Sequence, residues 1–180
     1  IDVRQRGARL TEGIEVLRKL WSGEEVEHTG TFYPFPPAQM LPAPAQEGGP
    51  PIWCGGRSDA ALRRAGEWAD GYLSYVVTPH MFRDAMDKIA QAADSAKRAM
   101  HRFDAAHLLF ARIDHTRETA LAKASESLSV RYAMDFRRAT ERYAACGTPA
   151  DVAEHIHAFY EAGVRHIVMD FVGPYEEKDA

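Results

Sequence analysis

The segment Gly55-Gly56-Arg57-Ser58 has the residue types and spacing of an anion-binding turn, because it joins a short apolar run to a polar helix. The run Ile52–Cys54 predicts a strand, and Ser58 is placed to cap the helix that follows. At such a junction the backbone N–H groups and the helix dipole attract an anion, glycine permits close approach, and arginine offers a fork of donors. The segment therefore suits a phosphate monoester. The alternative is a purely structural turn, and the pattern alone does not decide between the two.

Other residue types with possible chemistry are scattered along the chain. Of the eight histidines, His155 and His157 are two positions apart on a predicted helix and cannot face each other, so we expect surface histidines and no metal site. Cys54 and Cys146 are the only cysteines, too few for a disulfide framework. We expect Cys54 in the core. Asp170 falls near the carboxyl end of the last predicted strand, where barrel enzymes place functional groups.

Three further features invite a functional interpretation, and a structural one is favoured for each. Asp70 precedes a strand and is expected to fix a turn. Trp53 could flank a pocket but is expected to pack. The basic run Arg137–Arg142 could meet an anionic cofactor tail or substrate, but it is typical of a solvated helix face.

Helices and strands alternate along most of the chain. The first helix carries an apolar stripe of Leu10, Ile14, Leu17 and Trp21 and ends at Gly23. Residues 24–51 form a proline-rich excursion that begins with a hairpin turning at Thr29-Gly30. Further helices are predicted over Asp59–Ala69 and over the polar stretch Thr116–Tyr143. Another begins at Thr78-Pro79, and its buried face carries Phe82, Met86, Ile89, Ala93 and Ala96. The last runs from Thr148-Pro149 to Gly163; Asp151 completes its capping box, and its inward face carries Val152, Ile156 and Phe159. Strands are predicted over Ile52–Cys54, Gly71–Val77, His107–Ile113 and His166–Val172.

The repeated order of helix and strand, with strands of the type buried on both faces, predicts an α/β fold with a parallel sheet. An open doubly wound sheet could be complete in 180 residues, whereas an eight-stranded barrel needs about 250. The chain opens on Ile1 and enters a helix with no strand before it, which favours half of a (β/α)8 TIM barrel in a single partial domain, residues 1–180. Because a half-barrel has two open edges and an uncovered inner face, we expect it to aggregate or to form a homo-oligomer.

The bulk composition excludes several classes of partner. A formal charge of −4 leaves no basic field for nucleic acid or anionic lipid. No apolar run approaches the roughly 20 residues of a membrane span, and no signal peptide is recognisable. We therefore expect a soluble protein with neither nucleic acid nor membrane as a partner, and the presence of only two cysteines favours a reducing cytoplasm.

Motifs along nearly the whole chain resemble the luciferase-like monooxygenase family, the flavin- or F420-dependent TIM-barrel oxidoreductases. The similarity rests on Arg6, Arg9, Glu12, Leu17 and Trp21 in the first helix, on Gly30-Thr31-Phe32-Tyr33, on Pro51-Ile52 with Gly55-Gly56, and on Ala69-Asp70-Gly71. The resemblance implies the C-terminal half of the barrel, strands five to eight. It also implies that Gly55, Gly56, Arg57 and Ser58 help to hold the cofactor phosphate, with Arg6 or Arg9 reaching it, and that residues 116–143 form a mobile lid.

The resemblance leaves the cofactor open between FMN and F420. FMN would imply a two-component monooxygenase that receives reduced flavin from a partner flavin reductase, whereas F420 would imply hydride transfer to or from a small organic substrate. The catalytic residues are unknown, because those of the family lie largely in the other half of the barrel. Two alternatives remain: a non-catalytic barrel that binds flavin or nothing, and an unrelated phosphate-binding enzyme, such as a sugar-phosphate aldolase or isomerase.

Overall fold

A five-stranded sheet in which every strand pair is parallel forms the centre of the computed structural model, which describes residues 2–174. Its strands are β3 (Trp53–Gly55), β4 (Gly71–Tyr75), β5 (Asp104–Ile113), β6 (Ala145–Gly147) and β7 (His166–Phe171). The long strand β5 pairs with β4 through residues 104–108, with β7 through residues 106–111 and with β6 through residues 111–113. The predicted parallel α/β architecture is thus confirmed.

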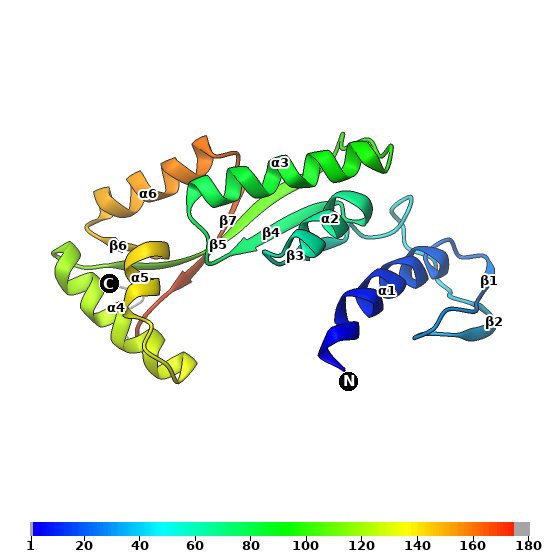
Figure 1. Cartoon of the computed structure of the whole chain (residues 1–180), viewed down its shortest axis with the longest axis horizontal. Coiled ribbons are helices and arrows are strands. Elements are labelled where there is room, and N and C mark those ends of the chain that lie inside the picture. The colour runs from blue at the N-terminus through cyan, green and yellow to red at the C-terminus, as the bar shows by residue number, and fades with distance from the viewer. Residues whose placement is uncertain (1, 175–180) are drawn as a thin grey trace.

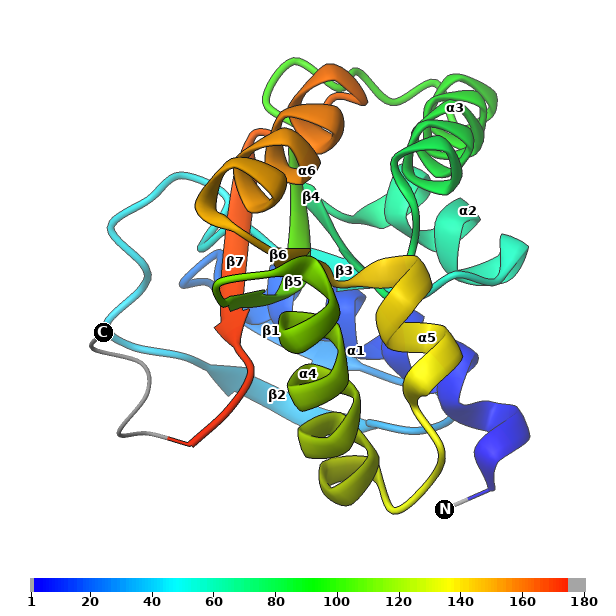
Figure 2. The same ribbon diagram turned by 90° about the vertical axis from the view of Figure 1, so that its left-hand side faces the viewer.

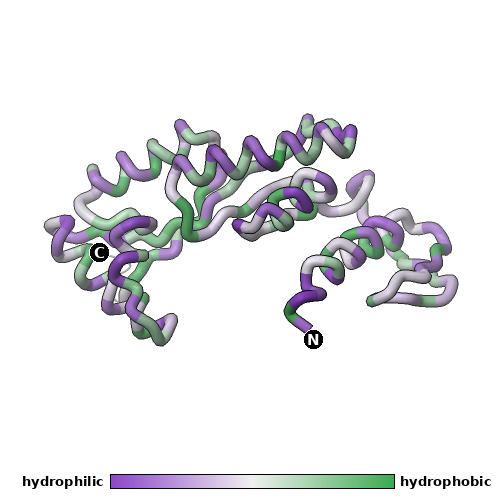
Figure 3. Tube along the Cα trace, in the orientation of Figure 1, coloured by the Kyte–Doolittle hydropathy of each residue, from purple (hydrophilic) through white to green (hydrophobic). Residues whose placement is uncertain are grey.

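Three helices cover one face of the sheet. They are α2 (Asp59–Trp68), α3 (Pro79–Ser95) and α6 (Pro149–Glu161), and Figure 2 shows α3 and α6 above the strands. Their apolar faces and the strand residues beneath them form one core cluster. The helices alternate hydrophilic and hydrophobic positions, as Figure 3 shows for α3 and α6, which is the pattern of a helix with one buried face. Of the expected buried positions on α3, Met86 is only half-buried and Ala96 is exposed, because Ala96 lies beyond the last helical residue.

The stretch 116–143 contains two helices, α4 (Arg117–Tyr132) and α5 (Arg137–Tyr143), at one end of the molecule (Figure 1). Ala133 has a left-handed backbone, with φ of 51°, and ends α4. The buried alanines and Leu128 of α4 pack with Phe110 and Cys146 in a second core cluster. The polar run Arg137–Arg142 is exposed except for Ala139 and the buried Thr140, so its interpretation as a mainly solvated helix face is confirmed.

The opposite end of the molecule holds α1 (Arg6–Leu20), preceded by the 3-10 turn η1 (Val3–Gln5), and the antiparallel pair β1 (Glu25–His28) and β2 (Phe35–Gln39) (Figure 1). The predicted hairpin is present, but residues 29–34 form its loop. Within α1 only Ile14 is buried, whereas Leu10 and Leu17 are 46% and 42% exposed. The described residues cover only one side of this apolar stripe.

Threonine and serine side chains begin the predicted helices. Ser58, Thr78 and Thr148 each accept a hydrogen bond from the backbone N–H three residues later, and Thr148 forms the expected capping box with Asp151. Each such cap stabilises a helix start by about 1 kcal/mol, which explains why these starts were predictable from sequence. No helix of the described chain is both long and apolar enough to cross a membrane.

The two faces of the sheet differ in exposure. Cys54 on β3 is 4% exposed and in the core, as predicted, whereas its neighbour Trp53 is 36% exposed. Tyr75 and Val168 are 37% and 47% exposed, and they lie with Trp53 on the face away from α3 and α6, here called the inner face. The described helices cover only one face of β3 and β7, so the uncovered inner face expected of a half-barrel is present.

Two histidines contradict the expectation that histidines lie at the surface. His28 and His107 are 6% and 1% exposed. His107 stacks on Phe159 of α6, with ring centroids 4.0 Å apart, and its Nδ1 lies 2.7 Å from the Ser74 hydroxyl. Burial, with a smaller contribution from the nearby His155, lowers the pKa of His107 from 6.5 to about 4. His107 is therefore neutral in the folded chain at neutral pH.

The low pKa of His107 predicts a loss of stability in mild acid. Between pH 6.5 and pH 4 the unfolded histidine binds a proton that the folded one does not, so the free energy of unfolding falls as the pH falls, by up to about 1.4 kcal/mol per pH unit. Urea denaturation at pH 7 and pH 5 should show a smaller loss for His107→Gln than for the unchanged chain. Equal slopes in the two proteins would contradict the expected titration.

Candidate functional site

The loop between β3 and α2 lies at the carboxyl edge of the sheet, where the sequence predicts a phosphate site. Gly55 is the last residue of β3, and Gly56 follows with φ of 115°, a conformation that side chains rarely adopt. A Cβ atom on Gly56 would lie 2.7 Å from the Cβ of Ala61 in the first turn of α2. Glycine is therefore required at this position both by the backbone angle and by the close approach of the helix.

The first turn of α2 presents free hydrogen-bond donors to solvent. Residues 55–60 are all exposed, and within the described chain nothing accepts a hydrogen bond from the backbone N–H groups of residues 57–60. The Ser58 hydroxyl accepts from the Ala61 N–H at 3.3 Å. Free amides at a helix N-terminus, where the dipole is positive, are suited to an anion with several oxygens.

Hydrogen bonds from the neighbouring strand hold this loop in place. The Tyr72 hydroxyl donates to the Gly56 carbonyl at 2.9 Å, and burial raises the pKa of Tyr72 to about 12 despite the nearby Arg57. The Arg57 guanidinium donates through Nη1 to the carbonyl of Val76 at 2.8 Å. The Arg57 side chain therefore connects the loop to the segment after β4. Its Nε and Nη2 groups have no acceptor in the described chain, so they can still bind a ligand.

Arg6 and Arg9, the two alternatives for a further phosphate ligand, lie on α1. Arg6 is exposed. The Arg9 guanidinium lies over the Phe32 ring, 4.5 Å from its centroid, and its Nε is buried without a partner among the described residues. Neither arginine has a described contact with residues 55–58. The choice between them stays a prediction.

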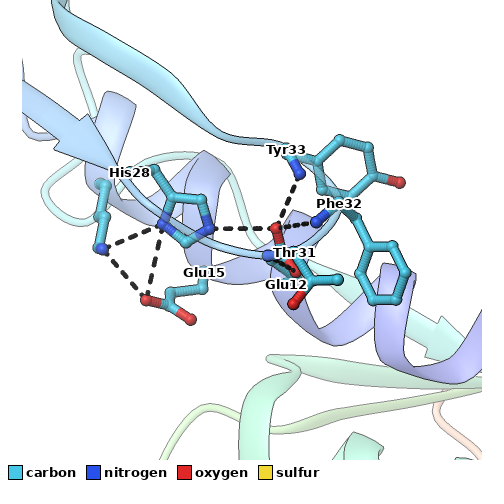
Figure 4. Close-up of polar contacts among 7 residues, drawn as sticks. Glu12, Glu15, His28, Thr31, Phe32 and Tyr33 are labelled. Carbon is cyan, nitrogen blue, oxygen red and sulfur yellow. Dashed lines mark hydrogen bonds and ion pairs between the residues drawn. The ribbon is translucent and has the colours of Figure 1, made fainter.

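A polar cluster joins α1 to the hairpin loop (Figure 4). The Glu12 carboxylate accepts hydrogen bonds from the backbone N–H groups of Phe32 and Tyr33, both at 2.8 Å, and of Thr31 at 3.2 Å. It also lies 3.3 Å from His28 Nε2. Desolvation acts to raise the pKa of Glu12, but the Tyr33 and Phe32 amides and His28 together outweigh it and lower that pKa below its ordinary value.

This cluster is structural rather than catalytic. The Glu12 carboxylate accepts hydrogen bonds from backbone amides, and His28 is buried, so neither group is free to accept a proton from a ligand. The contacts explain why the first helix and Gly30-Thr31-Phe32-Tyr33 belong together in the sequence resemblance, since one carboxylate holds the hairpin loop onto α1.

Asp70 is also a structural residue, as expected. Its carboxylate accepts from the Ile52 N–H at 2.9 Å, from Arg18 at 2.8 Å and from Arg98 at 3.1 Å. It thus joins α1, the start of β3 and the segment after α3. Asp170, by contrast, lies on β7 and forms an ion pair with Arg131 of α4 at 2.8 Å.

The residues around Asp170 form an aromatic cluster that sequence reasoning missed. The Tyr75 and Tyr132 hydroxyl oxygens are 2.6 Å apart, and both rings make edge contacts with Phe110, at centroid distances of 5.6 and 6.3 Å. Tyr132 stacks on Phe136 at 4.8 Å. The only local signal is that Tyr132 and Phe136 are four residues apart, and the sequence does not reveal their meeting with Tyr75.

Parallel strands connected by helices that cover one face of the sheet are the arrangement of part of a (β/α)8 barrel. The chain belongs to the luciferase-like monooxygenase family, whose family model matches residues 1–166.

Known proteins of this kind are longer than the chain. It is 28% identical to the F420-dependent glucose-6-phosphate dehydrogenase of Microbacterium testaceum, over 98% of this chain and 58% of that protein. It superposes on the monooxygenase RslO1 from Streptomyces bottropensis with a TM-score of 0.76 at 27% identity, covering 98% of this chain and 58% of the other. An F420-dependent secondary alcohol dehydrogenase bound to an F420-acetone adduct gives a TM-score of 0.82 at 17% identity, over 95% of this chain and 58% of the other, and this likeness shows the fold alone. The chain thus spans about 58% of the length of these relatives.

Proposed function

We propose that this chain is part of an oxidoreductase that uses F420 or FMN, and that the loop Gly55-Gly56-Arg57-Ser58 holds the cofactor phosphate. The observation that carries the proposal is the set of exposed, unbonded amides of residues 57–60 beside a glycine that permits close approach. A phosphate monoester offers several acceptor oxygens to such a set of donors. The names of the Microbacterium and Streptomyces relatives support the redox class, and the Microbacterium name supports F420.

Within this proposal the chain binds and orients, while the cofactor supplies electron or hydride transfer to a small organic substrate. The amides of residues 57–60 and the free Arg57 donors fix the phosphate end. Tyr72 holds the Gly56 carbonyl and so keeps the loop in the conformation in which these amides point outward. With FMN, the protein would act as a monooxygenase supplied by a flavin reductase. With F420, it would act as a dehydrogenase.

We further propose that the protein acts in the cytoplasm as a homo-oligomer. Both cysteines are free and buried, as suits a reducing compartment. The exposed apolar residues of the inner face, Trp53 and Val168 among them, favour association with a second protein surface.

Fluorescence-monitored titration with FMN and, separately, with F420 tests the proposed cofactor. Saturable binding of either supports the oxidoreductase, and the ligand that binds identifies the cofactor. If a folded chain binds neither, the glycine turn is structural and the non-catalytic alternative takes its place.

Replacing Arg57 and Ser58 together by alanine is expected to weaken binding of that cofactor about ten-fold or more, because two charge-assisted or hydroxyl contacts to the phosphate are lost. Loss of the Ser58 cap alone lowers stability by about 1 kcal/mol. Thr116→Ala removes a similar cap from α4, because the Thr116 side chain accepts a hydrogen bond from the Thr119 N–H. This control variant should leave cofactor affinity unchanged. An unaltered affinity in the double variant would remove the phosphate assignment.

A further inference from the structure

The inner face of the sheet carries a hydrogen-bonded pair of phenols from two distant parts of the chain. Tyr75 is the last residue of β4, Tyr132 is the last residue of α4, and their hydroxyl oxygens are 2.6 Å apart. Tyr75 is 37% exposed and Tyr132 is 40% exposed, so a small molecule can reach both residues.

This pair has one hydroxyl hydrogen left to donate. The bond between the two oxygens uses one O–H group, so the phenol that accepts this bond keeps its own O–H for another acceptor. Desolvation, followed by the hydrogen bond to Tyr132, raises the pKa of Tyr75 well above its ordinary value. Tyr75 therefore remains protonated near neutral pH, and the pair presents a donor rather than a negative charge.

The surroundings of the pair are aromatic and without net charge. Phe110 meets Tyr75 edge-on at 5.6 Å, and Phe136 stacks on Tyr132 at 4.8 Å. The cation beside the pair, Arg131, is bound to Asp170 at 2.8 Å. Its charge is thus already compensated, which disfavours a phosphate or carboxylate at this place.

The cluster lies close to the proposed cofactor loop in the fold. Gly55 on β3 pairs with Leu73 on β4, two residues before Tyr75. Gly55 and Tyr75 are the last residues of neighbouring parallel strands, so the loop after Gly55 and the Tyr75 residue lie at the same edge of the sheet.

We propose that Tyr75 and Tyr132 bind the oxygen of the substrate, and that the substrate is a neutral, largely apolar carbonyl compound rather than a phosphorylated sugar. The inference rests on the proposed function for its setting, since that function requires a substrate at this edge. The free phenol hydrogen donates to the carbonyl oxygen, and the partly exposed ring of Phe136, which stacks on Tyr132, contacts the apolar part.

Nuclear magnetic resonance of the 180-residue chain with 13C-labelled tyrosine rings tests this proposal, with acetophenone and glucose 6-phosphate as probes. Single Tyr→Phe variants at positions 75 and 132 assign the two signals. Acetophenone is expected to shift both signals saturably, and glucose 6-phosphate at the same concentration is expected to shift neither. A saturable response to the sugar phosphate would overturn the proposed substrate class.

Removal of both hydroxyls, in the double variant Tyr75→Phe with Tyr132→Phe, is expected to weaken acetophenone binding at least ten-fold. Binding to this variant is measured by the signals of the remaining labelled tyrosines and by Trp fluorescence. Because the rings are kept, the aromatic packing should persist, and circular dichroism checks it. If the double variant does not fold, the two single variants serve, and each should weaken binding. Tyr160→Phe, at a 55% exposed tyrosine of α6, should bind as the unchanged chain does. Binding that is unaffected by loss of the hydroxyls, or no binding of acetophenone, would reject the proposal.

Titration with FMN and F420 on the same samples separates the two proposals. Cofactor binding without an acetophenone response rejects this inference alone. Acetophenone binding at Tyr75 and Tyr132 in a chain that binds neither cofactor supports the phenol site and rejects the proposed function.

Discussion

Replacing Gly66 by alanine is expected to lower the free energy of unfolding by about 3 kcal/mol, because α3 packs directly against the backbone of α2 at this residue. A Cβ atom on Gly66 would collide with the carbonyl oxygen of Ile89. It would also lie 2.8 Å from the Cβ of Ala92 and 3.0 Å from the backbone nitrogen of Ala93. Two of these three atoms belong to the α3 backbone, so the helices must separate to make room. Urea denaturation measures the loss.

Gly13→Ala is the matched control, because Gly13 also lies inside a helix. Its Cβ atom would be 3.6 Å from a ring carbon of Tyr33, which is an ordinary contact. Alanine favours the helix over glycine by up to about 1 kcal/mol, so this variant is expected to be as stable as the unchanged chain or more so. Similar losses in both variants would show that the α2–α3 distance does not set the effect.

Asp70→Ala is expected to cost about 2–3 kcal/mol, because one carboxylate joins three separate segments. The substitution leaves Arg18 and Arg98 without their shared acid and the Ile52 N–H without its side-chain acceptor. Thermal and urea denaturation measure the change, and hydrogen exchange at the Ile52 amide reports the local opening.

Two further variants test the role of Asp70. Asp70→Asn keeps an acceptor for Ile52 but removes the charge that both arginines share, so an intermediate loss is expected. Glu67→Ala removes a half-buried acid that lies 3.8 Å from the exposed Arg63, and it should change stability by less than about 0.5 kcal/mol. If Asp70→Ala behaved like Glu67→Ala, the three segments would be held together by packing alone.

Much of the helical framework could be predicted because its signals are local. Ser58, Thr78 and Thr148 mark helix starts through side chains that bond to amides three residues away. Strand β6 was missed, because Ala145–Gly147 is too short to show periodicity and is identified as a strand by its pairing with the end of β5.

The exposure of the strands was predictable from the half-barrel interpretation and not from hydrophobicity, because hydrophobicity records what a residue prefers and not whether a second layer is present. Trp53 and Val168 have the residue types of buried strand positions, yet the helices of the described chain cover only the opposite face. The burial of His107 was missed for a related reason. Its partners Ser74 and Phe159 come from another strand and from α6.

The candidate phosphate loop was located from sequence because glycine before a helix cap is a local pattern. The hydrogen bond from Arg57 to the Val76 carbonyl was not predictable, because it depends on the positive φ of 54° at Val76, and no local sequence pattern predicts that angle. The meeting of Tyr75 and Tyr132 depends on bringing α4 against the sheet, across 57 residues of sequence.

The uncovered inner face also has an optical consequence. Trp53 is 36% exposed there, and its ring makes an edge contact with His166 of β7 at a centroid distance of 5.8 Å. Trp21, the C-cap residue of α1, and Trp68, the last residue of α2, are half-buried. A protein layer that covers the inner face would move the Trp53 indole from water into an apolar environment and shift its emission to shorter wavelengths. The face therefore contains its own fluorescent reporter of whatever binds there.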